Sequence, residues 1–334
     1  MINHEALMRR AMHMADTARI HTRPNPWVGA VVVCVGGAVY EGATQAPGSS
    51  HAEIMAMNAA VSAGDSLVGA TLYSTLEPCS HTGRTGPCAQ AIIDAGIAHV
   101  VAAISDPDEK VSGEGFAMLR AAGVQVTEGI CAADVAIQLA PYLHHRRTGR
   151  PFVMLKMATT IDARTAIPNG PRWITGEDAR IRVHQLRAES DAIVVGAGTV
   201  RADNPELTVR HVDGPSPRRI VLSRSQIAPT AKVHPCTVWN NDLESLLDTL
   251  GAEGVIQLMV EGGPTIATAF HERGLINKYV FHIAPTVSGS ADAPGVFAGD
   301  TALPLTDCTL ISAAAVGADL EIVLEPLREK VVTP

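Results

Sequence analysis

The chain alternates short apolar runs with amphipathic segments, and this pattern forms two series separated near residue 150. In the first series we expect helices at 5–20, 51–64, 87–96 and 113–123, and strands within 27–43, 69–79, 99–105 and 124–129. The stretch 27–43 predicts two strands joined at Gly36-Gly37, and Ser49-Ser50 is expected to cap the second helix. Strands that alternate with helices predict a layered α/β domain with largely parallel pairing.

The second series begins after the polar, basic stretch 144–151, whose composition is typical of a connector. Its pattern predicts helices at 175–190 and 242–254, strands at 152–162, 191–200, 218–223 and 278–287, and a strand, glycine turn and helix within 255–274. We expect Thr175 to cap the helix at 175–190. The pattern therefore predicts two α/β domains, at 1–145 and 152–334, joined by a linker at 146–151.

Composition and charge argue against several classes of partner. Hydrophobic residues make up 46% of the 334 positions, and the formal net charge is −8. Acidic residues outnumber basic ones in both halves, 13 against 10 in residues 1–150 and 21 against 16 afterwards, unlike a nucleic-acid-binding surface. No apolar run approaches the roughly 20 residues of a membrane span, and the N-terminal segment lacks the order of a signal peptide. We expect a cytoplasmic protein with no nucleic-acid or membrane partner.

The cysteines divide into two groups. Cys34, Cys131, Cys236 and Cys308 stand in apolar or turn surroundings without paired spacing, which predicts packing roles. Cys79 and Cys88 each follow a proline, and Cys88 opens a predicted helix. A disulfide framework is not expected in a long chain from a reducing compartment.

Together with His51 and Glu53, the second cysteine pair predicts a catalytic zinc site. The His51 imidazole and the Cys79 and Cys88 thiolates are suitable ligands for Zn²⁺, which leaves a fourth position for water. Zinc lowers the pKa of such a water, and Glu53 is placed to transfer protons without binding the metal. A closed structural zinc site is the alternative, and His81 is the candidate for the fourth ligand that it would need.

The order H-x-E followed by P-C is that of zinc nucleobase deaminases, but eight residues rather than two separate the cysteines here. The first half resembles the deaminase domain of the bifunctional riboflavin-biosynthesis deaminase/reductase family, in the stretches 23–33, 51–53, 69–88 and 105–126. The resemblance implies a cytidine-deaminase-like fold and a pyrimidine ribotide substrate. It also implies that Asn25, His81 and Arg84 contact this substrate. The chain departs from the family pattern at Thr44, Arg84 and Gly86.

Two glycine turns, at 196–199 and 261–265, each follow a predicted strand in the second half. Such turns can hold a phosphate at a helix N-terminus or can be simple turns, and neither is a G-x-G-x-x-G fingerprint. Residues 150–285 resemble the reductase domain of the same family, in the stretches 149–162, 173–180, 186–210 and 260–270. This resemblance implies a dihydrofolate-reductase-like fold that uses NADPH.

The resemblance also implies contacts for the second half. The residues implied for NADPH are Ala158, Trp173, Thr199, Asp203, Gly263, Pro264, Thr265, Ile266, Ala267, Thr268 and Ala269. Those implied for the substrate are Arg187, Leu207, Arg210 and Glu261, of which the arginines suit a phosphate. Departures such as Pro171 before Trp173 leave a weak or non-catalytic second domain as an alternative.

The resemblance thus implies an enzyme that catalyses two steps of riboflavin biosynthesis. The first is zinc-dependent deamination of 2,5-diamino-6-ribosylamino-4(3H)-pyrimidinone 5′-phosphate. The second is NADPH-dependent reduction of the ribosyl group of 5-amino-6-(5-phosphoribosylamino)uracil to ribityl. A nucleic-acid deaminase and a zinc-stabilised protein without activity are the competing hypotheses. We also expect a homo-oligomer, with a dimer favoured.

Overall fold

The computed structural model describes residues 3–81, 86–108, 112–168, 170–299 and 306–327. The chain separates into two compact units, Met1–Gly149 and Arg150–Pro334. The division falls inside the stretch 146–151, where the sequence predicted a linker. Helix α6 (Ala140–Thr148) covers the first part of that stretch and ends at Gly149, which has a φ of 72°. The polar, basic segment is therefore partly helical.

Strands of the first unit form a mixed sheet. Within its described residues, five strands lie in the order β2 (Val39–Ala43), β1 (Gly29–Val33), β3 (Thr71–Leu76), β4 (His99–Ile104) and β5 (Gln125–Glu128). Strand β1 is antiparallel to both of its neighbours, whereas β3, β4 and β5 run parallel. The expectation of largely parallel pairing is therefore wrong for the β2–β1–β3 half of this sheet. Strands β1 and β2 are joined by a tight connection, which allows an antiparallel pair, and β3 reaches the other side of β1 after α2.

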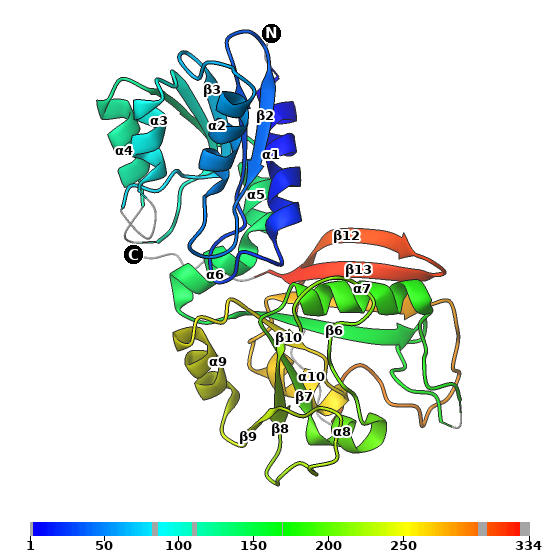
Figure 1. The fold of residues 1–334 in the computed structure, drawn as a ribbon. Helices are drawn as coiled ribbons and strands as arrows, with labels where there is room; N and C mark the ends of the chain where they lie inside the picture. Colours follow the sequence, from blue (N-terminus) through cyan, green and yellow to red (C-terminus); the bar gives the residue numbers. More distant parts are fainter. Residues whose placement is uncertain (1–2, 82–85, 109–111, 169, 300–305, 328–334) are drawn as a thin grey trace. The chain divides into compact units, whose positions relative to one another are not determined.

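Helices cover both faces of this sheet (Figure 1). One face carries α1 (His4–Ala18) and α5 (Ala132–Gln138), and the other carries α2 (Ala52–Ser62), α3 (Cys88–Asp94) and α4 (Glu114–Ala121). Close approach of helix and sheet depends on glycines: a Cβ at Gly42 would lie 2.4 Å from the Ala52 carbonyl oxygen, and one at Gly29 would lie 1.8 Å from that of Ala11. No side chain larger than hydrogen fits at either contact.

The second unit contains a larger, mostly parallel sheet. Its described strands lie in the order β12 (Cys308–Val316), β13 (Asp319–Pro326), β11 (Lys278–Ala284), β6 (Phe152–Thr160), β10 (Gln257–Val260), β7 (Ala192–Gly196), β8 (Arg218–Leu222) and β9 (Thr237–Trp239). Strands from β11 to β9 are parallel, and the β12–β13 hairpin adds two antiparallel strands at the other edge.

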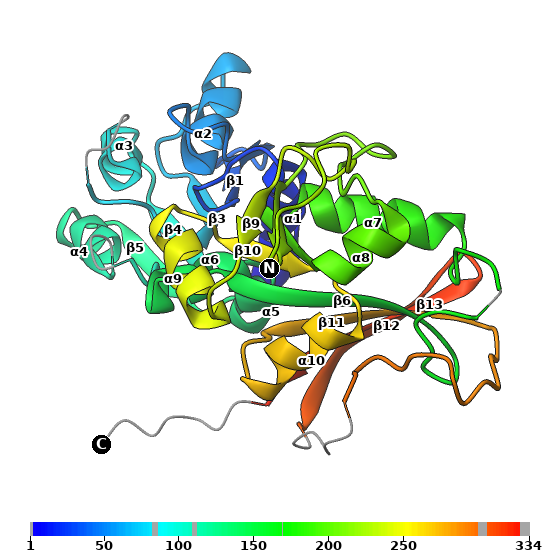
Figure 2. The same cartoon turned by 90° about the horizontal axis from the view of Figure 1, so that it is seen from below.

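Two apolar cores lie on opposite faces of this sheet, and each face carries helices (Figure 2). Helices α9 (Leu243–Ala252) and α10 (Pro264–Glu272) pack on one core, and α7 (Glu177–Ala188) packs on the other with α8 (Ala197–Asp203) at its end. The sequence did not predict the β12–β13 hairpin, β9 or α5, and the stretch 196–199 opens α8 rather than forming only a turn. None of the described helices combines the length and apolarity that crossing a bilayer requires.

Candidate functional site

Three elements of the first unit bring His51, Cys79 and Cys88 together. His51 is the N-cap of α2, where the sequence had predicted a serine cap; Cys79 follows the carboxyl end of β3, and Cys88 is the first residue of α3. The His51 Nδ1 atom lies 3.6 Å from Cys79 Sγ and 3.3 Å from Cys88 Sγ. All three donor atoms lie within 4.8 Å of one another, and no other such group occurs among the described residues.

The chemistry of this cluster fits a zinc ion. The Cys88 thiol and the His51 ring both hydrogen-bond Cys79, and the Cys88 backbone N–H donates to Cys79 Sγ at 3.3 Å. The neighbouring Cys88 thiol, these hydrogen bonds and His51 outweigh burial and lower the pKa of Cys79 to about 4. Two thiolates and an imidazole are three ligands that Zn²⁺ prefers, and a fourth position remains for a small molecule.

Glu53 lies in the first turn of α2, one residue beyond the helix start. Its side chain is 3% exposed, and burial, which outweighs the attraction of His51, raises its pKa to about 7. The carboxyl group is not part of the three-atom cluster. A buried carboxyl with a near-neutral pKa beside the metal ligands suits proton transfer rather than metal binding.

The three residues predicted to contact the substrate in the first unit differ in their surroundings. Asn25 is half-buried and donates its N–H to the Thr22 carbonyl in a turn. His81 is exposed and does not belong to the metal cluster, so the described residues offer no fourth protein ligand for a closed structural zinc site. Arg84 lies outside the described residues. A small hollow of about 280 Å³ lies beside Gly86 and Pro87.

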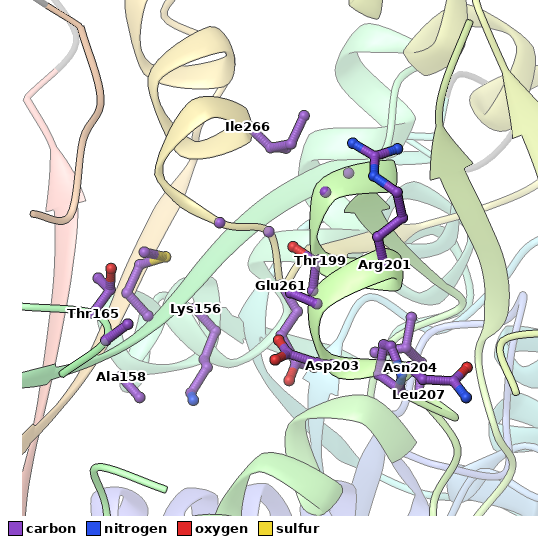
Figure 3. A pocket seen from close by; sticks show the side chains of 18 of the residues that line it. Lys156, Ala158, Thr165, Thr199, Arg201, Asp203, Asn204, Leu207, Glu261 and Ile266 are labelled. Atoms are coloured by element: carbon purple, nitrogen blue, oxygen red, sulfur yellow. The ribbon is translucent and has the colours of Figure 1, made fainter. Parts of the chain in front are cut away.

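A larger cleft of about 1250 Å³ lies in the second unit. Its walls come from β6, α7, α8 and the turn after β10, at the carboxyl ends of parallel strands, where α/β sheets usually bind ligands. Figure 3 shows Lys156 and Ala158 on β6 and Thr199 and Asp203 on α8, with Glu261 among them. The predicted residues that line it are Ala158, Trp173, Arg187, Thr199, Asp203, Leu207, Arg210, Glu261, Gly263, Pro264, Thr265 and Ile266.

The remaining part of the segment implied for NADPH turns away from the cleft. Ala267 is fully buried and Ala269 packs on the same apolar core. The Thr268 hydroxyl donates to the Ala298 carbonyl oxygen at 2.9 Å. Only the first turn of α10 lines the cleft, because successive helical residues point in different directions.

The two predicted arginines have different environments. Arg187 is 8% exposed; it forms a two-point ion pair with Glu261, and its third nitrogen donates to the Thr208 carbonyl. The Arg210 side chain is 46% exposed and pairs with Glu206 at 2.7 Å. The guanidinium of Arg210 is therefore accessible to an anionic ligand, whereas that of Arg187 is largely buried.

Sequence reasoning missed Lys156, which also lines the cleft. It is 7% exposed, and burial, opposed by the charge of Glu261, lowers its pKa. The available signal was a lysine in the middle of the apolar strand FVMLKMATT, because a buried charge is rare unless it serves a purpose.

Comparisons with known proteins agree with this division. The family model of the cytidine and deoxycytidylate deaminase zinc-binding region matches residues 1–104, and that of the RibD C-terminal domain matches residues 151–322. The riboflavin biosynthesis protein RibD of Escherichia coli (strain K12) is 37% identical to this chain; the match covers 87% of the chain and 90% of the relative.

Solved structures extend the likeness to the fold. Acinetobacter baumannii RibD is 33% identical, with a TM-score of 0.88 over 97% of this chain and 99% of that one. A diaminohydroxyphosphoribosylaminopyrimidine deaminase/5-amino-6-(5-phosphoribosylamino)uracil reductase from Thermotoga maritima is 31% identical, with a TM-score of 0.86 over 97% and 99%.

These matches decide between the sequence-based alternatives. The zinc-binding-region match and the His51, Cys79 and Cys88 cluster give the first unit Zn²⁺ as its cofactor, and the C-terminal match gives the second unit NADPH. No comparison favours a deaminase with a non-catalytic second unit. The chain therefore belongs to the RibD family of riboflavin-biosynthesis proteins, and it is a bifunctional deaminase and reductase.

Proposed function

We propose that the first unit deaminates 2,5-diamino-6-ribosylamino-4(3H)-pyrimidinone 5′-phosphate and that the second unit reduces the ribosyl group of the deaminated product. The observation that carries this proposal is the buried Glu53 beside three converging ligand atoms, of His51, Cys79 and Cys88. The likeness to the Thermotoga maritima protein, a diaminohydroxyphosphoribosylaminopyrimidine deaminase, supports the choice of substrate.

In the deamination, Glu53 would move protons between water and the leaving group. Bound Zn²⁺ supplies a water of lowered pKa as the nucleophile. Glu53 would transfer the two protons of the attacking water, one to a ring nitrogen and one to the amino group, which leaves as ammonia while the ring carbon gains an oxo group. Burial raises the pKa of Glu53 to about 7, so its carboxyl group can both accept and release a proton near neutral pH.

In the reduction, the residues of the second cleft would bind and orient the ribotide. NADPH, when bound, would supply the hydride that C1′ of the ribose accepts. Lys156, which lines the cleft, would donate a proton to the ring oxygen as the C1′–O4′ bond breaks, which leaves a ribityl chain. Arg210, whose guanidinium is exposed on the cleft, would bind the 5′-phosphate. Glu261, held by Arg187, would accept a hydrogen bond from a ribose hydroxyl.

We also propose that the enzyme works in the cytoplasm as a homodimer. All six cysteines are free of disulfide bonds. Cysteines that bind a metal must stay reduced, and the cytoplasm is a compartment that keeps thiols reduced. Strand β12 is an edge strand of its sheet, and its Leu310 is 59% exposed. A second copy of the chain could pack against this edge.

One experiment tests the two-step function. Zinc-loaded protein is given the diamino ribotide with and without NADPH, and products are identified by mass spectrometry. We expect a deaminated product alone without NADPH, and a ribityl product when NADPH is present. Chelation of zinc should abolish deamination but spare the reduction of supplied 5-amino-6-(5-phosphoribosylamino)uracil. Zinc-loaded protein that neither deaminates nor oxidises NADPH would refute the proposal.

A further inference from the structure

We propose that Glu77 is a positioning residue of the deaminase, because its carboxylate fixes Cys79 by binding the backbone of Asp106 and of residues 113–116. The inference rests on the proposed zinc site. Glu77 directly follows β3 and lies two residues before Cys79. Its side chain is 3% exposed.

The carboxylate of Glu77 is held by backbone N–H groups of a distant segment. Its Oε2 atom accepts from Asp106 at 3.2 Å and Gly113 at 3.0 Å, and its Oε1 atom accepts from Gly115 at 2.9 Å and Phe116 at 3.3 Å. Two of these donors belong to the first turn of α4, where N–H groups have no partner within the helix. Among the described residues Glu77 forms no ion pair, so these four hydrogen bonds are what offsets the burial of its charge.

A second contact fixes the same point of the chain from the other side. A Cβ at Gly115 would lie 2.0 Å from the Pro78 carbonyl oxygen, so the backbones of α4 and of the 78–79 peptide touch directly. The peptide that enters Cys79 is thus held by the Glu77 side chain and by the glycine contact together. Beyond it, the Cys79 carbonyl accepts the Ala89 N–H at 3.1 Å, next to Cys88.

Asp106, one of the four donors to Glu77, is itself anchored, so it can act as a fixed support. The Tyr142 hydroxyl lies 3.1 Å from both carboxylate oxygens of Asp106. Asp106 in turn accepts the Asp108 N–H at 2.9 Å. Tyr142 belongs to α6, so hydrogen bonds connect Glu77 through Asp106 to that helix.

The geometry predicts what a minimal change at Glu77 does. In Glu77→Gln, an amide NH₂ replaces one oxygen and faces two N–H donors, so two hydrogen bonds are lost and donors oppose each other. Cys79 is then less firmly placed relative to His51 and Cys88. Groups that orient metal ligands typically change metal affinity or activity by about 10- to 100-fold when replaced.

The test compares Glu77→Gln with Glu114→Gln, an exposed glutamate of the same segment. We expect the zinc dissociation constant of Glu77→Gln, measured by chelator competition, to rise at least about tenfold. Amide hydrogen exchange should accelerate at Asp106, Gly113, Gly115 and Phe116. With saturating zinc, the deaminase kcat should fall while KM stays near the wild-type value. Glu114→Gln should match the wild type, and reductase activity should be unchanged in both.

Gly115→Ala provides a second route, because its methyl group would lie 2.0 Å from the Pro78 carbonyl oxygen and 3.1 Å from Glu77 Oε1, and so displaces the peptide that enters Cys79 together with the carboxylate that supports it. We expect the same rise in the zinc dissociation constant, and this variant decides the matter if Glu77→Gln does not fold. Wild-type zinc affinity and kcat in a folded variant would overturn the inference, as would a loss that tracks only melting temperature. Failure of the wild-type protein itself to bind zinc would instead refute the proposed function.

Discussion

Arg187 and Glu261 neutralise each other on the wall of the reductase cleft. The Arg187 Nε atom lies 2.8 Å from Glu261 Oε2, and its Nη2 atom lies 2.7 Å from Oε1. Although burial works against both charges, their attraction prevails: it raises the pKa of the Arg187 guanidinium and lowers that of the Glu261 carboxyl. Both residues were expected to contact substrate, and the structure shows that each stabilises the charged form of the other.

Breaking this pair should destabilise the second unit. In Glu261→Gln the Arg187 cation stays largely buried without its counter-charge, so we expect the unfolding free energy to fall by about 3 kcal/mol. Glu206→Gln removes the partner of Arg210 in an exposed pair and should cost less than about 1 kcal/mol. Urea unfolding measures both changes, and equal costs would contradict the structural role of the Arg187–Glu261 pair.

Glu53→Gln should abolish deamination selectively. The amide cannot accept and release the proton, so we expect the deaminase kcat to fall by about 10²- to 10⁴-fold. Because Glu53 is not one of the three clustered ligands, zinc content measured by atomic absorption should stay at the wild-type level. Reductase activity serves as the internal control. A variant that retains deaminase activity would exclude Glu53 as the proton-transfer group.

Lys156→Met should impair the reductase and leave the deaminase intact. Loss of the proton donor is expected to lower the reductase kcat by at least about 100-fold. Burial lowers the pKa of Lys156, so the wild-type rate should decline with rising pH at a value below that of an exposed lysine. Steady-state rates of NADPH oxidation across pH measure both effects. An unchanged profile in the variant would remove Lys156 from the mechanism.

Stability of the second unit should fall in mild acid because of His184. Burial, together with the positive charges of Arg187, His211 and Arg210, lowers the pKa of His184 to about 4. Its neutral Nδ1 accepts the Arg210 N–H at 3.1 Å. The unfolded chain binds the proton first, so the contribution is fully present above about pH 6.5 and is lost as the pH falls towards 4.

The variant His184→Gln should lack this part of the pH dependence. Calorimetric melting of the wild type and the variant at a series of pH values between those limits measures it. Parallel losses of stability in the two proteins would assign the acid sensitivity to other groups.

The convergence of His51, Cys79 and Cys88 could be predicted because each residue lies at a terminus of a recognisable element. His51 opens a helix, Cys79 follows a strand, and Cys88 follows a proline at a helix start, so the elements alone bring them to one edge of the sheet. The role of Glu77 in the same stretch could not be predicted. Its partners lie 29 to 39 residues further along the chain. They are backbone N–H groups, which every residue except proline has, so no residue type in the sequence indicates them.

Other features lacked a periodic signal. Strand β12 is exposed at six of its nine positions, so it shows no alternation of buried and exposed residues. Helix α6 has consecutive His and Arg residues, and only tertiary packing of Tyr142 and Leu143 shows that it is folded. Of residues 263–269, those from Gly263 to Ile266 line the cleft, because a helix cannot present every residue to one cleft.

The contact at Gly42 has a consequence for how the deaminase can vary. This position has no room for a single added carbon against the Ala52 carbonyl, and Ala52 lies between His51 and Glu53. Every possible replacement of Gly42 adds at least that carbon. A mutation here would therefore shift the start of α2, which carries both His51 and Glu53, although Gly42 itself lies on β2.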